Sequence, residues 1–239
     1  MYFPVSGVET NPLVPLLAAF FISLLTTPAG VSGAFLLLPF QVSILGFTSP
    51  AVSPTNLIYN IVATPGGIYR YMREGRVVWP LVWTVVLGTL PGVFIGAVLR
   101  VRYLSDPRAF KIFVGFVLLY LGARLLYEAL KRLRGPARHP PPEAGSGEGI
   151  LPAVGVVRTT DISARRIEYE FAGRRFSFDT VPVFLLSLFV GVIGGIYSIG
   201  GGSIIAPFFV LIFGLPVYTV AGAALIATFL TSAAGVLFY

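Results

Sequence analysis

The chain is almost free of charged residues over two long stretches. Residues 1–69 and 176–239 contain only two charged side chains, Glu9 and Asp179, and the 34 residues from Leu13 to Gly46 contain none. Only 11% of the 239 residues are charged, whereas a soluble domain has about 25%. Apolar segments of this length are stable in lipid rather than in water. The sequence therefore predicts an all-α, polytopic membrane protein.

A segment near the N-terminus recurs 168 residues later without a gap. Residues 31–40 read VSGAFLLLPF and residues 199–208 read IGGGSIIAPF, each a run of small residues inside a long apolar segment. A continuous helix over Leu13–Gly46 would be roughly 50 Å long, against ~30 Å of hydrocarbon. We therefore expect duplicated halves whose helices are broken and re-entrant. Re-entrance makes the halves inverted, the arrangement typical of broken-helix repeats, whereas a full crossing would make them parallel.

The sequence divides into three parts. Residues 1–134 form a first membrane repeat, 135–180 a linker with a β-hairpin, and 181–239 a second membrane repeat. The hairpin is indicated by period-two alternation in residues 167–171 and 175–178; the alternative is a disordered loop. The 168-residue offset pairs Tyr239 with Tyr71, so residues 72–134 have no counterpart. This predicts that the C-terminal half is truncated.

The basic residues predict the orientation. Three lie in residues 70–76 and four follow Tyr127, on one predicted face, whereas four in residues 100–111 lie on the other. The positive-inside rule then places the small β-hairpin insertion in the cytoplasm. The formal net charge of +7 is therefore explained by loops that flank a membrane, and no nucleic acid is expected as a partner.

The two breaks are the predicted binding site. Glycines let backbone N–H groups approach a ligand, and the half-helix that follows presents its positive dipole end, so a small anion is the expected guest. The alternative is that these small residues only allow close helix packing. The candidate residues are Thr27, Gly30, Ser32 and Gly33 in the first copy, and Ser198, Gly200, Gly201, Gly202 and Ser203 in the second.

Asn56 and Asn60 extend this prediction to the next apolar segment. Their i,i+4 spacing places them on one helix face, either facing the substrate or bonding neighbouring helices. Apart from Arg124, the apolar segments contain no ionisable Asp, Glu, Lys or Arg. Proton-coupled carriers usually place such a group in the membrane. A neutral site instead suits an anion, which a carboxylate would repel.

Enzymatic chemistry has few residues to use. The chain has no Cys, and its single His139 lies in a Pro-rich stretch. A nucleophile–base pair or a metal site is therefore hard to assemble. We predict no enzyme activity, no metal and no cofactor.

The duplicated glycine motif resembles that of the sulfite exporter TauE/SafE family. The resemblance rests on Gly200–Ser203 followed by Pro207, its copy at Ser32–Pro39, and the YRYMREGR sequence at 69–76. It covers residues 13–127 and 181–239 and implies a permease of the bacterial or archaeal inner membrane for sulfite, sulfonates and other small organic anions. The first copy has fewer glycines than the family pattern, the insertion at 136–180 is longer than a minimal member needs, and the second half is incomplete.

The resulting hypothesis is a multi-pass secondary transporter that exports a small anion, such as sulfite or an organosulfonate, across the inner membrane. The alternatives are a passive anion channel and an accessory or sensor subunit that acts through the hairpin. The expected partners are the anion and the lipid bilayer, with a homo-oligomer also open.

Overall fold

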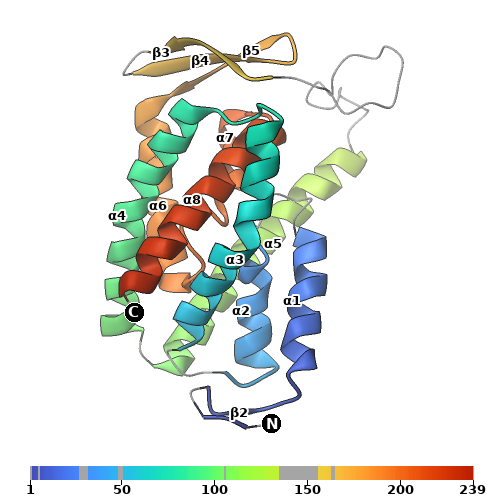
Figure 1. Ribbon diagram of the computed structural model, residues 1–239, viewed down its shortest axis with the longest axis vertical. Helices are drawn as coiled ribbons and strands as arrows, with labels where there is room; N and C mark the ends of the chain where they lie inside the picture. The colour runs from blue at the N-terminus through green and yellow to red at the C-terminus, as the bar shows by residue number, and fades with distance from the viewer. Residues whose placement is uncertain are drawn as a thin grey trace.

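The protein is helical, with two small β-sheets at its ends (Figure 1). This computed structural model describes residues 2–4, 6–26, 32–47, 51–104, 106–134, 156–162 and 165–238. The helices are α1 (Leu13–Thr26), α2 (Ala34–Ser43), α3 (Val52–Arg73), α4 (Trp79–Tyr103), α5 (Pro107–Arg134), α6 (Thr180–Tyr197), α7 (Ile205–Phe213) and α8 (Val217–Phe238). The strands are β1 (Tyr2–Phe3), β2 (Val8–Glu9), β3 (Arg158–Ile162), β4 (Arg166–Phe171) and β5 (Arg174–Asp179).

Three helices of the described part, α4, α6 and α8, are long and apolar enough to cross a membrane. Large apolar side chains on their outward faces, such as Trp83 and Leu87 on α4 and Phe189 on α6, are more than half exposed. Side chains of this kind are stable against lipid rather than water. The fold agrees with the prediction of a membrane protein that is mainly helical.

Helices α4 and α6 pack together through small residues. A Cβ built on Gly92 would lie 2.9 Å from the Cα of Gly191, and one on Gly96 would lie 2.9 Å from the Cα of Gly195. Real Cβ atoms do not approach backbone atoms so closely, so only glycine permits this separation. Because residue numbers increase together along the contact, the two helices run parallel. The facing sets are Gly88, Gly92 and Gly96 on α4, and Ser187, Gly191 and Gly195 on α6.

Helices α3 and α8, which the 168-residue offset pairs, run in opposite directions. The start of α3 meets the end of α8, because Leu57 contacts Gly235. The end of α3 lies near the start of α8, because Tyr71 contacts Gly222. Figure 1 shows the same relation, with α3 rising toward the large sheet and α8 descending from it.

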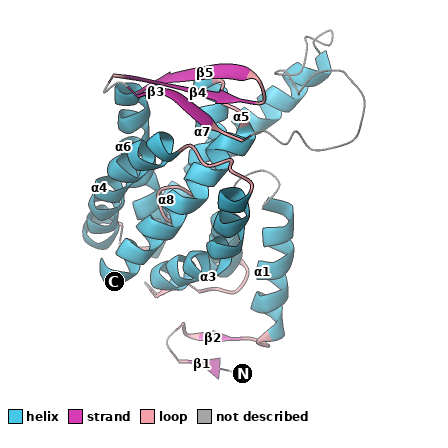
Figure 2. Cartoon of the chain, turned by 45° about the horizontal axis from the view of Figure 1, so that its top comes forward, coloured by secondary structure: helices cyan, strands magenta, loops and turns pink. Residues whose placement is uncertain are grey.

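The larger sheet has the order β3–β4–β5, with both pairs antiparallel. The turn between β4 and β5 is Ala172–Gly173, both with positive φ, as a two-residue hairpin turn requires. Alternate residues of β4, Ile167, Tyr169 and Phe171, are buried. Figure 2 shows the sheet lying across one end of the helices. We call this the sheet end of the molecule.

The predicted hairpin segment at 167–178 is thus occupied by β4 and β5, and β3 is an addition that the sequence patterns did not indicate. The cytoplasmic location of the sheet stays a prediction. Most of the predicted linker, residues 135–155, lies outside the described residues.

The two broken segments enter from opposite ends of the molecule. Helix α1 begins far from the sheet, and α2 leads back toward that end, where α3 begins (Figure 1). Helix α6 begins directly after β5 at the sheet end, and α7 leads back to the start of α8 at that same end.

Candidate functional site

The second break is a short turn between α6 and α7. Ser198 ends α6 in the left-handed conformation, with φ 62° and ψ 40°, and its N–H donates to the carbonyls of Gly194 and Gly195. Gly200 follows with φ +79°, so the chain reverses within a few residues. Ile205 then begins α7. We call residues 198–204 the glycine turn.

Neighbouring helices enclose the glycine turn tightly. A Cβ on Gly200 would lie 2.6 Å from the Oγ of Ser232 on α8, and one on Gly201 would lie 2.7 Å from the Cβ of Thr89 on α4. A Cβ on Gly202 would collide with the carbonyl of Ala224 on α8. All three glycines are therefore needed for the turn to fit between α4 and α8.

The first break meets the second directly. The backbone N–H of Ser32 donates to the carbonyl of Ser203 over 3.3 Å. Gly33, the next residue, has no room for a side chain, because a Cβ would collide with the hydroxyls of Ser23 and Tyr59. Thr27 and Gly30, predicted for the same site, lie outside the described residues. The structure therefore brings Ser32 to the glycine turn, with Gly33 beside it in the chain.

Asn60 on α3 connects both breaks to α8. Its side chain is fully buried, and its Oδ1 accepts a hydrogen bond from the hydroxyl of Ser32 over 2.5 Å. Its Nδ2 donates to the carbonyl of Ile199 over 2.5 Å and to the Oγ of Ser232 over 3.3 Å. The amide group thus uses both of its protons and its oxygen.

Helix α8 contributes two polar residues that the sequence reasoning missed. Thr231 accepts a hydrogen bond from the N–H of Gly201 over 3.1 Å, and Ser232 accepts one from Asn60. The 168-residue offset pairs Asn56 and Asn60 with Ala224 and Thr228, which are less polar. The polar pair lies one turn further along the helix, where a wider comparison of the two copies would have found it.

Two amide groups of the glycine turn have no partner among the described residues. The N–H groups of Gly200 and Gly202 have no hydrogen-bond acceptor there, although both residues are buried. Buried N–H groups without partners are rare because each costs free energy comparable to a lost hydrogen bond. In the described part of the chain the glycine turn thus has two more donors than acceptors for them.

Other predicted residues have different partners. Ser203 donates its hydroxyl to the carbonyl of Ile199. Ser198 is 1% exposed. Asn56 lies away from the Asn60 hydrogen bonds and donates instead to the Oε1 of Gln41 on α2 over 2.8 Å, while its own Oδ1 is buried without a partner in the described residues.

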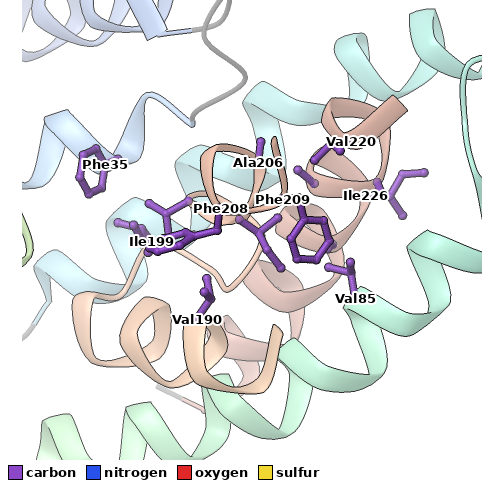
Figure 3. Close-up of a cluster of buried hydrophobic side chains, with 14 of the residues drawn as sticks. Phe35, Val85, Val190, Ile199, Ala206, Phe208, Phe209, Val220 and Ile226 are labelled. Carbon is purple, nitrogen blue, oxygen red and sulfur yellow. The ribbon is translucent and has the colours of Figure 1, made fainter. Parts of the chain in front are cut away.

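An apolar wall surrounds the turn. Figure 3 shows Ile199, Phe208 and Phe209 among buried side chains from several helices. The ring of Tyr197 stacks on Phe35 of the first half, with centroids 5.5 Å apart, and its hydroxyl donates to the carbonyl of Phe35 over 3.1 Å. Hydrogen bonds and partial charges act more strongly where water is excluded in this way.

The site contains no ionised side chain. Its polar groups are amides, hydroxyls and backbone dipoles, and no cluster of His, Asp or Glu among the described residues could hold a metal ion. The arrangement can donate hydrogen bonds to a ligand but has no residue pair suited to proton abstraction or nucleophilic attack.

Long apolar helices around a buried, neutral turn define a helical membrane protein. The profile of the family described as Sulfite exporter TauE/SafE matches residues 15–239, nearly the whole chain. The chain therefore belongs to the sulfite exporter TauE/SafE family of membrane transport proteins, as the resemblance in its motifs implied. No curated protein and no solved structure matches it.

Proposed function

We propose that the protein is a secondary transporter that exports a small anion, such as sulfite or an organosulfonate, across the inner membrane. The observation that supports this most directly is the glycine turn, where the buried N–H groups of Gly200 and Gly202 have no acceptor among the described residues. An oxyanion would supply the missing acceptors.

The chemistry of the surroundings favours an anion over a cation. Successive N–H groups at a turn that leads into a helix make an anion-binding concavity, and the dipole of α7 adds positive potential. Asn60 and Thr231 hold the turn in shape through Ile199 and Gly201. Because no carboxylate lies in the apolar segments, nothing there repels a negative ligand.

The transport cycle follows from the proposed symmetry. The antiparallel run of α3 and α8, and the entry of α1–α2 and α6–α7 from opposite ends, support inverted repeats with re-entrant broken helices. The first repeat comprises residues 1–134 and the second residues 181–239, with the insertion at 135–180 between them. Rocking one repeat against the other exposes the site to alternate sides of the membrane.

Basic residues support the orientation. Arg70 and Arg73 lie in the last turn of α3, near the sheet end, whereas Arg100 and Arg102 lie in the last turn of α4, at the opposite end. Together with the basic residues after Tyr127, this excess supports a cytoplasmic location of the sheet end.

Flux through proteoliposomes tests the function. Vesicles loaded with sulfite, sulfoacetate or taurine should release at least one of these anions faster with the wild-type protein than without it. Gly201→Leu should abolish this release, because the added side chain would strike Thr89 and displace the turn. Gly222→Ala is the matched control, since its Cβ would have an ordinary 3.4 Å contact with Tyr71. Normal flux in Gly201→Leu would overturn the site.

A further inference from the structure

We propose that the three-stranded sheet is a strap across the sheet end, and that opening at this end requires residues 156–157, before β3, to detach from Gly75. This inference rests on the proposed alternating-access cycle, because it names the contact that the cycle must break. The sheet is attached to the second half by more contacts than to the first half.

The sheet is firmly attached to the second half. Strand β5 continues into α6 without a gap, and the N–H of Thr180 donates to the carbonyl of Arg165 over 3.0 Å. The hydroxyl of Tyr169, whose side chain is fully buried, lies 3.0 Å from the Oγ1 of Thr219 on α8. The sheet therefore moves together with α6 and the start of α8.

Its attachment to the first half is much smaller. The N–H of Val157 donates to the carbonyl of Gly75, in the α3–α4 loop, over 2.8 Å. The side chain of Val156 packs on Gly75 but is still 58% exposed. This contact, which we call the latch, is the weaker of the two attachments.

Near the latch, the α3–α4 region of the first half also contacts the start of α8 in the second half. The guanidinium of Arg76 lies 5.3 Å from the ring centroid of Tyr218. Gly222, at the start of α8, is buried against Tyr71 and Val77 of the first half. If α8 moves away from α3 at this end, these contacts part, and the sheet, which follows α8, must release Gly75.

Thiol labelling tests the strap without relying on transport. The chain has no Cys, and a Cβ at Gly222 would stand 3.4 Å from Tyr71, so Gly222→Cys fits as a buried reporter. Adding Val156→Asp, which places a charge at the latch, should raise its labelling rate by a membrane-impermeant maleimide at least threefold. Thr160→Asp, a charge at an exposed position of β3, is the matched control and should leave the rate unchanged. Equal rates with and without Val156→Asp would overturn the strap.

A cross-link tests the same contact in the opposite direction. An ideal Cβ on Gly75 lies 3.7 Å from the Cβ of Val156, within the range that a disulfide spans. Oxidation of the Gly75→Cys/Val156→Cys protein should lower anion flux at least tenfold, with recovery on reduction, whereas each single variant should keep its flux. Full flux in a protein shown to be cross-linked would overturn the proposal. If the wild type moves no anion, the proposed function fails, and the labelling result still decides the strap.

Discussion

Asn60 is the side chain on which the two helix breaks converge. Its three hydrogen bonds satisfy a hydroxyl of the first break, a carbonyl of the second and a hydroxyl of α8. In a water-free environment each lost hydrogen bond is costly, and the loss of this one amide would remove a bond from all three groups.

Replacing Asn60 by Leu should therefore disable the site. We expect anion flux to fall at least tenfold, because the carbonyl of Ile199 loses the amide donor and the glycine turn loses its connection to α3. Proteoliposome flux, normalised to folded protein, measures this. Thr55→Ala, on the exposed face of α3, is the control, because the Thr55 hydroxyl donates to the carbonyl of Ala51, one turn earlier in the chain. Wild-type flux in Asn60→Leu would contradict the proposed role.

Gly202 should tolerate no side chain. A Cβ there would collide with the carbonyl of Ala224 and lie 2.5 Å from the N of Thr228, both backbone atoms that cannot move aside cheaply. We expect Gly202→Ala to lower the melting temperature measurably and to reduce flux. Gly222→Ala on α8, where a Cβ has room beside Tyr71, should change neither the melting temperature nor the flux. Equal melting temperatures of the two variants would show that the turn is not packed as described.

At this scale the sequence selected some residues that the structure brings together, but not their partners. The repeat selected Ser32 and the i,i+4 polar spacing selected Asn60, whose Oδ1 accepts a hydrogen bond from the Ser32 hydroxyl. Asn56 was selected by the same i,i+4 spacing, but its side chain donates to Gln41. The spacing predicts which helix face a residue lies on, but not which residue it meets there. Thr231 was missed because the 168-residue offset pairs Asn60 with Thr228, one turn before Thr231.

At the scale of elements, the parallel α4–α6 pair packs closely, since a Cβ on Gly96 would collide with the carbonyl oxygen of Val192. Helix α6 carries the turn at its end, while Thr89 on α4 closes over Gly201. Without a hydrophobic driving force between helices in lipid, close van der Waals contact over small residues holds such a pair together.

Gly92→Ala should separate these helices. The new Cβ would stand 2.5 Å from the carbonyl of Leu188. Overpacking of this kind costs about 1–3 kcal/mol. We expect a lower melting temperature in detergent. Gly115→Ala on α5, where nothing lies within 4 Å, should raise the melting temperature slightly, because Ala favours helix. Similar shifts in both variants would contradict the packing.

Tyr169 should make the sheet sensitive to alkali. Burial raises the pKa of its phenol to about 12, only partly opposed by its hydrogen bond to Thr219. An unfolded Tyr ionises near about 10, so between these values the unfolded chain binds fewer protons and stability falls as pH rises. The wild type should therefore lose more melting temperature between pH ~9 and pH ~11 than Tyr169→Phe. Parallel losses in the two proteins would contradict this.

The elements were predictable where a periodic pattern marks them. Alternation over residues 167–171 and 175–178 indicated the segments of β4 and β5; every second side chain of β4 is buried, and Phe178 of β5 is buried as well. Strand β3 was not predicted, because RTTDI has no apolar alternation and forms a strand only by pairing with β4. The α4–α6 contact was also not predicted: its glycines recur every four residues, but nothing in the sequence identifies the partner helix.

For the whole molecule, we propose that the two broken segments, which begin at opposite ends, belong to inverted repeats. Parallel halves would place both breaks on one side, whereas here Ser32 and Ser203 meet backbone to backbone from opposite ends. In the proposed cycle this junction is exposed to each side of the membrane in turn. Inversion of the halves stays a prediction, and the contact between the breaks required the structure.

Counterflow of labelled sulfite most directly tests the claim that the two breaks form one anion site in a carrier. Proteoliposomes loaded with unlabelled sulfite are diluted into a trace of labelled sulfite, and uptake is followed for the wild type and for Asn60→Leu. We predict transient accumulation of label above equilibrium in the wild type and none in the variant. Uptake that never exceeds equilibrium would indicate a channel, and accumulation in both proteins would contradict the site.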